Sequence, residues 1–336
     1  MSCFNATPTA STFARYAVIV SSLPRSTPES QNVSASAISD FATALGQLDS
    51  VHSMMVVRHG KVVGEQWWTP GSPDLPHVMW SLSKSFTSTA VGLVISDGLL
   101  SLDDRIVDLL PEDVPAEIDA NLAALSVRHL LTMSTGHASE SLPDGDRGAD
   151  TNWARHVLAQ PLEFEPGTRF VYNSGATYLL SAIVQRLTGE TVLDYLTPRI
   201  FEPLGITGPT WEQSPQGISV GAWGLSIRTE DVAKFGQLYL QHGQWEGAQL
   251  VPADWVSEAT SRQVSNEGSS DQPDWIQGYG FQFWQCRFGA FRGDGKDGQF
   301  CIVMPEQDAV VVLTAELTDM REELDLVWTH ILPGMQ

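Results

Sequence analysis

Sequence patterns typical of β-strands lie near the two ends of this chain, and the stretch between them is patterned mostly as helices. Near the N-terminal end, Met54–Arg58 and Lys61–Trp68 are joined by His59-Gly60, a two-residue linker typical of a β-hairpin. Further strands are predicted near the other end, at Gly278–Cys286, Gln299–Met304 and Val310–Ala315. We therefore expect an α+β fold, in which an antiparallel sheet built from both chain ends and flanked by helices carries an inserted helical lobe.

On this interpretation the residues form an arm followed by a single two-lobed domain. Residues 1–35 are rich in Ser, Thr and Pro and are expected to form an extended arm. The domain spans residues 36–336, with an α/β lobe at about 36–80 and 215–336 and a helical lobe at about 81–214. A cleft between two lobes is the usual place for a small-molecule site.

The charge balance excludes several kinds of partner. The chain has 40 acidic and 19 basic side chains and a formal net charge of −21, which argues against nucleic acid and anionic membrane surfaces. No apolar run reaches the roughly 18 residues of a membrane-spanning helix, and the N-terminus lacks the pattern of a signal peptide. We therefore expect a cytoplasmic protein that acts on a small molecule, while the sequence leaves its oligomeric state open.

The cysteines are too few for a disulfide framework. There are three of them, Cys3, Cys286 and Cys301. Free thiols are the favoured interpretation, and a Cys286–Cys301 bridge between neighbouring strands is the alternative.

Lys84, one of only four lysines, follows Ser81 by three residues at the start of an apolar helix that ends near Gly98. Positions three apart share a helix face, with Cβ atoms about 5–6 Å apart. A serine hydroxyl needs a neighbouring base to become a nucleophile. A buried lysine can be that base, or its charge can keep a tyrosinate in place. This short motif also arises by chance, so its position at a helix start carries most of the weight.

A second polar element, Tyr172-Asn173-Ser174, stands at the start of a helix that is predicted to run from Ser174 to Leu187 and to end at Gly189. If Tyr172 lies in the cleft, cationic neighbours would lower the pKa of its hydroxyl. The alternative is a tyrosine that only packs at a helix start. The sequence contains neither a G-x-S-x-G nor an H-E-x-x-H motif, and its histidines lack metal-ligand spacing, so no metal or cofactor is expected.

With both elements in view, the sequence resembles the serine β-lactamase and penicillin-binding-protein superfamily from about residue 35 to the C-terminus. It is similar to the class C-like group, which includes carboxylesterases, D-amino-acid peptidases and 6-aminohexanoate-dimer hydrolase. Besides the serine and lysine motif, the resemblance rests on "LSLDDRIVDLLPE", "LSVRHLLTMSTGH", "PGTRFVYNSGATYLLSAIVQRLTG", "FEPLGI" and "GAWGLSIRTEDVAKFGQLYL".

The resemblance implies a role for each matching residue. Ser81 would be the acylated nucleophile, and Lys84 would hydrogen-bond both Ser81 and the tyrosine. Tyr172 would be the general base and later the general acid, and Ser174 falls on the third position of the tyrosine motif. The Ser81 N–H and an edge strand beside the cleft would form the oxyanion hole.

The third family motif, Lys-Thr-Gly or His-x-Gly, is where the sequence departs from the pattern. The matching residues are Gly293, Asp294 and Gly295, which lack the cation that binds a β-lactam carboxylate. This departure puts efficient β-lactam hydrolysis in doubt. An Asp294 carboxylate facing the cleft would also repel anionic substrates, unless it points to solvent or pairs with Arg292. Arg292 and Lys296 flank the motif and could compensate for the missing cation.

The resemblance favours a serine hydrolase that forms an acyl-enzyme on a small ester. The alternatives are an amidase or peptidase acting on short or D-configured peptides or linear amides, a β-lactamase, and a non-catalytic binding or sensor protein of the same fold. Trp80, Trp223 and Arg292 are the candidate substrate-binding residues, because they adjoin the motifs. No cofactor is expected.

Overall fold

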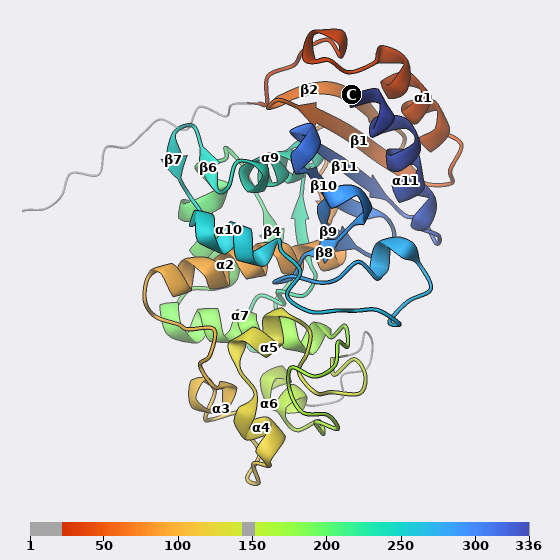
Figure 1. Ribbon diagram of the computed structural model, residues 1–336. Helices are drawn as coiled ribbons and strands as arrows, with labels where there is room; N and C mark the ends of the chain where they lie inside the picture. Colours follow the sequence, from red (N-terminus) through yellow and green to blue (C-terminus); the bar gives the residue numbers. More distant parts are fainter. Residues whose placement is uncertain (1–21, 143–151, 336) are drawn as a thin grey trace, which may run out of the picture.

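The computed structural model describes residues 22–142 and 152–335, so most of the expected arm and Cys3 lie outside the described residues (Figure 1). Its main feature is a six-stranded antiparallel sheet in the order β2-β1-β11-β10-β9-β8. The strands are β1 (Val51–Arg58), β2 (Lys61–Trp67), β8 (Trp284–Gln285), β9 (Phe291–Gly295), β10 (Gln299–Met304) and β11 (Ala309–Ala315). The predicted α+β fold, with one sheet built from both ends of the chain, is confirmed.

The β1–β2 hairpin turns at the predicted two-residue linker. His59 and Gly60 both have positive φ, 49° and 71°, which is the backbone that joins tightly twisted antiparallel strands. On its other side β1 pairs with β11 from the far end of the sequence, in a register that includes Val56 opposite Val311. The sheet is therefore closed by contacts between segments more than 250 residues apart, which sequence patterns predict only in outline.

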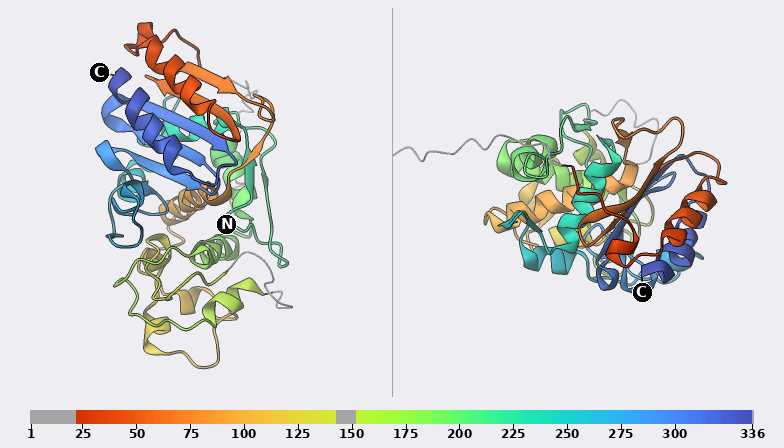
Figure 2. Two further views of the ribbon diagram at one scale, coloured as in Figure 1. Left: turned by 90° about the vertical axis from the view of Figure 1, so that its right-hand side faces the viewer. Right: turned by 90° about the horizontal axis from the view of Figure 1, so that it is seen from above.

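Helices cover both faces of the sheet (Figure 2). One face packs against α1 (Ala35–Leu45) and α11 (Arg321–Leu326), through a core that includes Phe41 and Leu324. The other face packs against α9 (Thr229–Leu240), and α2 (Ser83–Ser96) lies behind it, where Phe86 stacks on Phe235 with ring centroids 3.8 Å apart. The start of α2 is thereby fixed close to the sheet.

The helices between residues 106 and 188 form the second half of the molecule, below the sheet in Figure 1. At its centre is α7 (Ser174–Thr188), which ends at Gly189 with φ of 75°, as the sequence predicts. A small sheet, β3 (His77–Val78), β5 (Leu225–Ile227) and β4 (Thr210–Trp211), connects the two halves. The other elements are α3 (Ile106–Leu109), α4 (Ala120–Ala124), α5 (Val127–Leu131), α6 (Trp153–Leu158), α8 (Val192–Leu196), β6 (Gln244–Trp245), β7 (Ala248–Gln249) and α10 (Ala253–Ala259).

Two predicted features differ in detail. The strand predicted at Gly278–Cys286 is shortened to β8, because Gly278 and Gln282 have positive φ, 116° and 65°, which interrupts the extended backbone. The domain boundary expected at residue 36 falls inside the first turn of α1, which begins at Ala35 with Ser34 as its N-cap. Cys286 and Cys301 are both buried and free, so the free-thiol interpretation is confirmed for these two cysteines.

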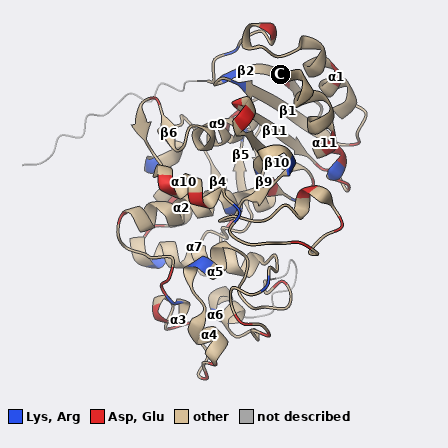
Figure 3. Ribbon diagram, viewed as in Figure 1, with Lys and Arg blue, Asp and Glu red and all other residues tan. Residues whose placement is uncertain are grey.

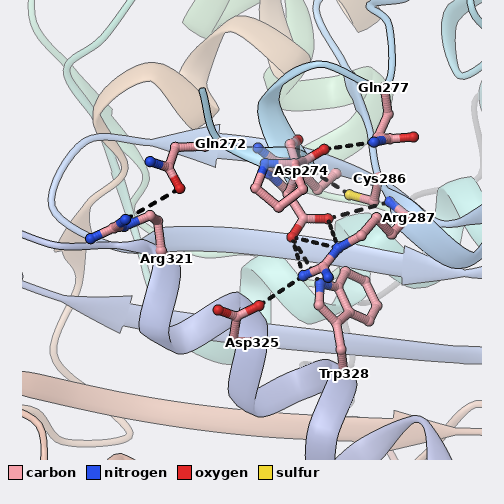
Figure 4. A network of polar contacts seen from close by, with 10 residues as sticks. Gln272, Asp274, Gln277, Cys286, Arg287, Arg321, Asp325 and Trp328 are labelled. Carbon is pink, nitrogen blue, oxygen red and sulfur yellow. Dashed lines mark hydrogen bonds and ion pairs between the residues drawn. The ribbon is translucent and has the colours of Figure 1, made fainter. Parts of the chain in front are cut away.

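A polar network ties the loop before β8 to α11 and the sheet (Figure 4). The buried Asp274 carboxylate accepts hydrogen bonds from Arg287 Nη2 at 2.8 Å and Trp328 Nε1 at 3.1 Å. The Asp274 carbonyl accepts from Arg292 Nη1 of β9 at 2.8 Å. Arg287 also pairs with the exposed Asp325 at 2.7 Å. Asp274 is therefore the residue through which this loop is held against the sheet.

We predict that Asp274→Ala lowers the free energy of unfolding by about 3 kcal/mol, since it leaves Arg287 and Trp328 without their buried acceptor. The matched control is Asp325→Ala, which removes a solvent-exposed partner of the same arginine and should cost less than about 1 kcal/mol. Urea denaturation followed by circular dichroism measures both. Equal losses of unfolding free energy in the two variants would contradict the inference that Asp274 holds this loop against the sheet.

Candidate active site

Ser81 lies in a 3₁₀ turn, Trp80–Leu82, which leads directly into α2. Trp80 has a positive φ of 45°, a backbone that non-glycine residues rarely adopt and that often marks functional sites. Ser83 and Ser85 face away from the cleft: the Ser83 hydroxyl accepts from Leu225 N and the Ser85 hydroxyl donates to the Gln282 carbonyl. These contacts fix the turn that presents Ser81.

Lys84 connects three parts of the chain through its single side-chain nitrogen. Its Nζ lies 2.9 Å from Ser81 Oγ, 3.2 Å from Ser174 Oγ and 2.9 Å from the Ala222 carbonyl oxygen. The side chain is 1% exposed. Such a buried amine needs its donors satisfied, and the three oxygens provide this. The structure thus brings together Ser81, Lys84 and Ser174; the resemblance implied Ser81 and Tyr172 as the partners of Lys84, and the contact with Ser174 was not predicted.

Tyr172 lines the same cavity as Ser81, and its ring lies next to Lys84. Lys84 Nζ is 4.9 Å from the centroid of its ring, and the ring stacks on Trp284 with centroids 5.3 Å apart. Burial raises the pKa of Tyr172 above its ordinary value, and Asp294 adds to that increase. The expected lowering of this pKa is therefore wrong, because the loss of solvent outweighs the cationic surroundings.

Sequence reasoning missed the carboxylate that holds the start of α7. Glu140 accepts from Ser174 N at 2.7 Å and from Gly175 N at 3.2 Å, so it binds the positive end of the helix directly after Tyr172. The Asn173 side chain caps the same helix by accepting from Gly175 N at 2.9 Å. No local pattern points to Glu140, because it acts on a helix that starts 34 residues later.

The predicted glycine motif forms the end of β9, where the strand runs against the Ser81 turn. A Cβ at Gly293 would lie 3.1 Å from Leu82 Cγ, and one at Gly295 would lie 2.2 Å from the Met79 carbonyl oxygen. Partner strand β8 pairs only with Phe291 and Arg292, so it leaves this end of β9 uncovered. The close approach explains why both positions have no side chain, and it suits the oxyanion hole expected beside Ser81.

Asp294 lines the cavity, but not as an isolated carboxylate. Its Oδ2 accepts from Arg292 Nε at 2.9 Å, and Arg292 Nη2 lies 2.8 Å from the same oxygen. Burial raises the pKa of Asp294, and Arg292 opposes that effect. The structure therefore shows the alternative in which Asp294 pairs with Arg292. The expected repulsion of anionic substrates by an unpaired Asp294 carboxylate does not apply.

None of the three predicted substrate-binding residues lines the cavity. Arg292 is fully buried behind Asp294 and bonded also to Cys286 Sγ at 3.2 Å, so it positions Asp294 and cannot contact a substrate directly. Trp223 lies against Trp153 in the core of the helical half. Trp80 does not line the cavity either, but its ring supports Lys296, which does.

The cavity beside Ser81 has a volume of about 630 Å³. Four of its thirteen lining residues are aromatic, and the mixture of apolar and polar side chains suits a small organic substrate of moderate size. Trp275 and Trp284 are the tryptophans that line it, and the sequence alone could not select them from eleven. The lining residues are Ser81, Arg169, Phe170, Val171, Tyr172, Gly268, Ser269, Ser270, Trp275, Trp284, Asp294, Lys296 and Met320.

Within residues 22–142 and 152–335, no group of three or more His, Cys, Asp or Glu side chains is arranged to hold a metal ion. In the same part of the chain, no helix is both long enough and apolar enough to cross a membrane.

Several named proteins are similar to this chain in sequence. The chain is 26% identical over 293 residues to 6-aminohexanoate-dimer hydrolase of Paenarthrobacter ureafaciens, covering 80% of this chain and 73% of that protein. It is 28% identical to penicillin-binding protein 4 of Amycolatopsis lactamdurans, covering 73% and 74%. A lovastatin esterase of Penicillium rubens is 27% identical over 44% of each chain.

Solved structures agree on the fold. The octameric penicillin-binding protein homologue from Pyrococcus abyssi aligns with a TM-score of 0.70 at 19% identity, over 90% of this chain and 77% of that one. The hydrolase EstCE1 aligns with a TM-score of 0.72 at 18% identity, over 89% and 99%. The sequence model of the family described as Beta-lactamase matches residues 47–332. This chain therefore belongs to the Beta-lactamase family and is a serine hydrolase of that family.

Proposed function

We propose that the protein hydrolyses a small ester through an acyl-enzyme formed on Ser81. The observation that carries this proposal is the 2.9 Å contact between Lys84 Nζ and Ser81 Oγ at the base of an aromatic cavity. A serine with a buried amine at hydrogen-bond distance, next to an open substrate volume, has what an activated nucleophile needs. No cofactor takes part in this reaction.

The proposed proton path follows from the neutral state of Tyr172. Lys84, as the free amine, takes the Ser81 proton while Ser81 Oγ attacks the carbonyl carbon. The carbonyl oxygen becomes negative and is bound by the Ser81 N–H and the uncovered end of β9. Tyr172, which burial keeps protonated, donates to the leaving-group oxygen, and the proton on Lys84 then returns to the tyrosinate. Water repeats these steps in reverse to release the acid and free Ser81.

A linear amide is the second candidate substrate. It is favoured by the similarity to 6-aminohexanoate-dimer hydrolase, which covers 80% of this chain, whereas the similarities to lovastatin esterase and to esterase EstB of Burkholderia gladioli cover 44% and 45%. Gly293 leaves no cation beside the nucleophile for a β-lactam carboxylate, so β-lactamase activity ranks below both. A panel of p-nitrophenyl esters, aminohexanoate oligomers, D-peptides and a chromogenic cephalosporin ranks the candidates by kcat/KM.

We predict that Ser81→Ala abolishes ester hydrolysis, lowering kcat by at least about 10³-fold, and prevents labelling by a fluorophosphonate probe. The neighbouring Ser85→Ala is the control. Its hydroxyl donates to the Gln282 carbonyl, away from Lys84, so this variant should still be labelled at its nucleophile. Intact-protein mass spectrometry and p-nitrophenyl butyrate kinetics measure both. Labelling of a folded Ser81→Ala protein would refute the assignment.

Lys84→Ala and Tyr172→Phe should each lower kcat by about 10²–10⁴-fold, since each removes one partner of a shared proton path. The double variant should lose little more than the worse single variant, because residues that act as a unit are not additive. Steady-state kinetics of the three variants tests this. Losses that multiply in the double variant would show that the two side chains act independently.

Because burial raises the pKa of Tyr172, this side chain should remain a phenol throughout the neutral and mildly alkaline range. Subtracting the absorbance of the Tyr172→Phe variant from that of the wild type at 295 nm should therefore show no tyrosinate between pH 7 and about pH 10. A tyrosinate signal at pH 7 would instead support the other role considered for Lys84, a cation that keeps Tyr172 ionised as the general base.

A further inference from the structure

The cavity beside Ser81 carries positive charge in a strongly acidic protein. Acidic residues outnumber basic ones 40 to 19 in the sequence, and they are spread along the ribbon (Figure 3). Yet the residues that line the cavity include Arg169 and Lys296, and the only carboxylate among these described lining residues is Asp294. Asp294 is already paired with the buried Arg292, so the two lining cations are not balanced by it.

Lys296 is held at the rim and remains available. It follows directly on β9, its side chain is 63% exposed, and Nζ lies 5.2 Å from the centroid of the Trp80 ring. Its ion contact among the described residues is with Asp297 at 3.8 Å, a separation at which an exposed pair contributes little. The ring beneath it restricts the ammonium without neutralising its charge.

Arg169 is supported in the same way from the other wall. It lies three residues before Tyr172, on the segment that leads into α7, and its guanidinium stacks over Phe164 at 4.5 Å. The side chain is exposed, and it forms no ion pair with any residue in the described part of the chain. Two cations, each resting on an aromatic ring, therefore face the cavity from the sheet side and the helical side.

The cavity lining also includes aromatic surface. Phe170, Trp275 and Trp284 line it, and they offer an acyl chain aromatic surface but no charge. At the nucleophile itself Gly293 supplies no cation, and no side chain fits there without displacing Leu82 or Ser85. A negatively charged group next to the scissile bond of a substrate therefore has no cation from residue 293 to pair with. One that reaches the rim can pair with Lys296 or Arg169.

We propose that the preferred substrates are elongated esters whose acyl chain ends in a carboxylate, which Lys296 and Arg169 bind at the rim of the cavity. This inference rests on the proposed ester hydrolysis and names its substrate class. It reverses the expectation, drawn from Asp294 alone, that anionic substrates are disfavoured in general. A carboxylate close to the reacting carbonyl remains disfavoured, because the cations lie at the rim and not at residue 293.

The test compares mono-p-nitrophenyl adipate with p-nitrophenyl hexanoate, which have acyl chains of equal length that end in a carboxylate and a methyl group. After subtraction of the uncatalysed rate, the ratio of kcat/KM, anionic over neutral, should be about tenfold in favour of the adipate at low salt. Lys296→Gln and Arg169→Gln should each lower this ratio about threefold, and the double variant should bring it close to one. High salt should lower the wild-type ratio as well.

The matched control is Lys61→Gln, which removes an exposed lysine at the start of β2, outside the cavity lining, and should leave the ratio unchanged. A ratio that stays the same in the double variant, or a wild-type ratio below one, would overturn the proposal. If both esters are hydrolysed but the ratio contradicts the rim site, ester hydrolysis is still supported. The experiment therefore distinguishes failure of the rim site from failure of the proposed ester hydrolysis.

Binding to the inactive Ser81→Ala protein provides a readout that needs no turnover. Monomethyl adipate and methyl hexanoate are titrated while the fluorescence of the cavity tryptophans is followed. Tighter binding of the adipate, lost when Lys296→Gln and Arg169→Gln are added, supports the rim site even if neither ester is hydrolysed. Equal binding of the two ligands would overturn it.

Discussion

The contacts of Lys84 Nζ are the interaction on which the rest of the site depends. One buried nitrogen contacts Ser81 at the head of α2, Ser174 at the head of α7 and the Ala222 carbonyl before β5. The nucleophile and the start of the helix after Tyr172 are therefore joined through a single group. A buried amine is stable only while its donors have acceptors, so the same contacts that prepare Ser81 also fix how the helices meet.

The sheet supplies the opposite wall, and its construction explains the glycines in the third motif. β9 passes so close to the Ser81 turn that a side chain at Gly293 or Gly295 would contact Leu82 or the Met79 carbonyl. Asp294, between them, is the residue of the motif that lines the cavity. It pairs with Arg292, which in turn donates to the Asp274 carbonyl. The wall beside Ser81 therefore consists of aromatic rings and the Asp294–Arg292 ion pair. Gly293 places no cation there.

The sequence predicted those features that depend on local chemistry. Short patterns or resemblance to a family predict the His59-Gly60 hairpin, the α7 helix with its end at Gly189, and the contact between Ser81 and Lys84. It did not predict Glu140, whose carboxylate caps a helix 34 residues further along, because that contact exists only after the helical half has folded. The pKa of Tyr172 was predicted in the wrong direction, since burial cannot be read from the residue types near a motif.

The central claim, that Ser81 is acylated during turnover, is tested most directly by rapid acid quenching during hydrolysis of p-nitrophenyl butyrate, followed by proteolysis and mass spectrometry. Acid stops deacylation, so an ester intermediate stays on the residue that carries it. The account predicts a butyryl group on the peptide that contains Ser81, with fragment ions that place it on that residue and not on Ser83 or Ser85. Continued turnover with no acylated peptide, or with the butyryl group on another residue, would contradict it.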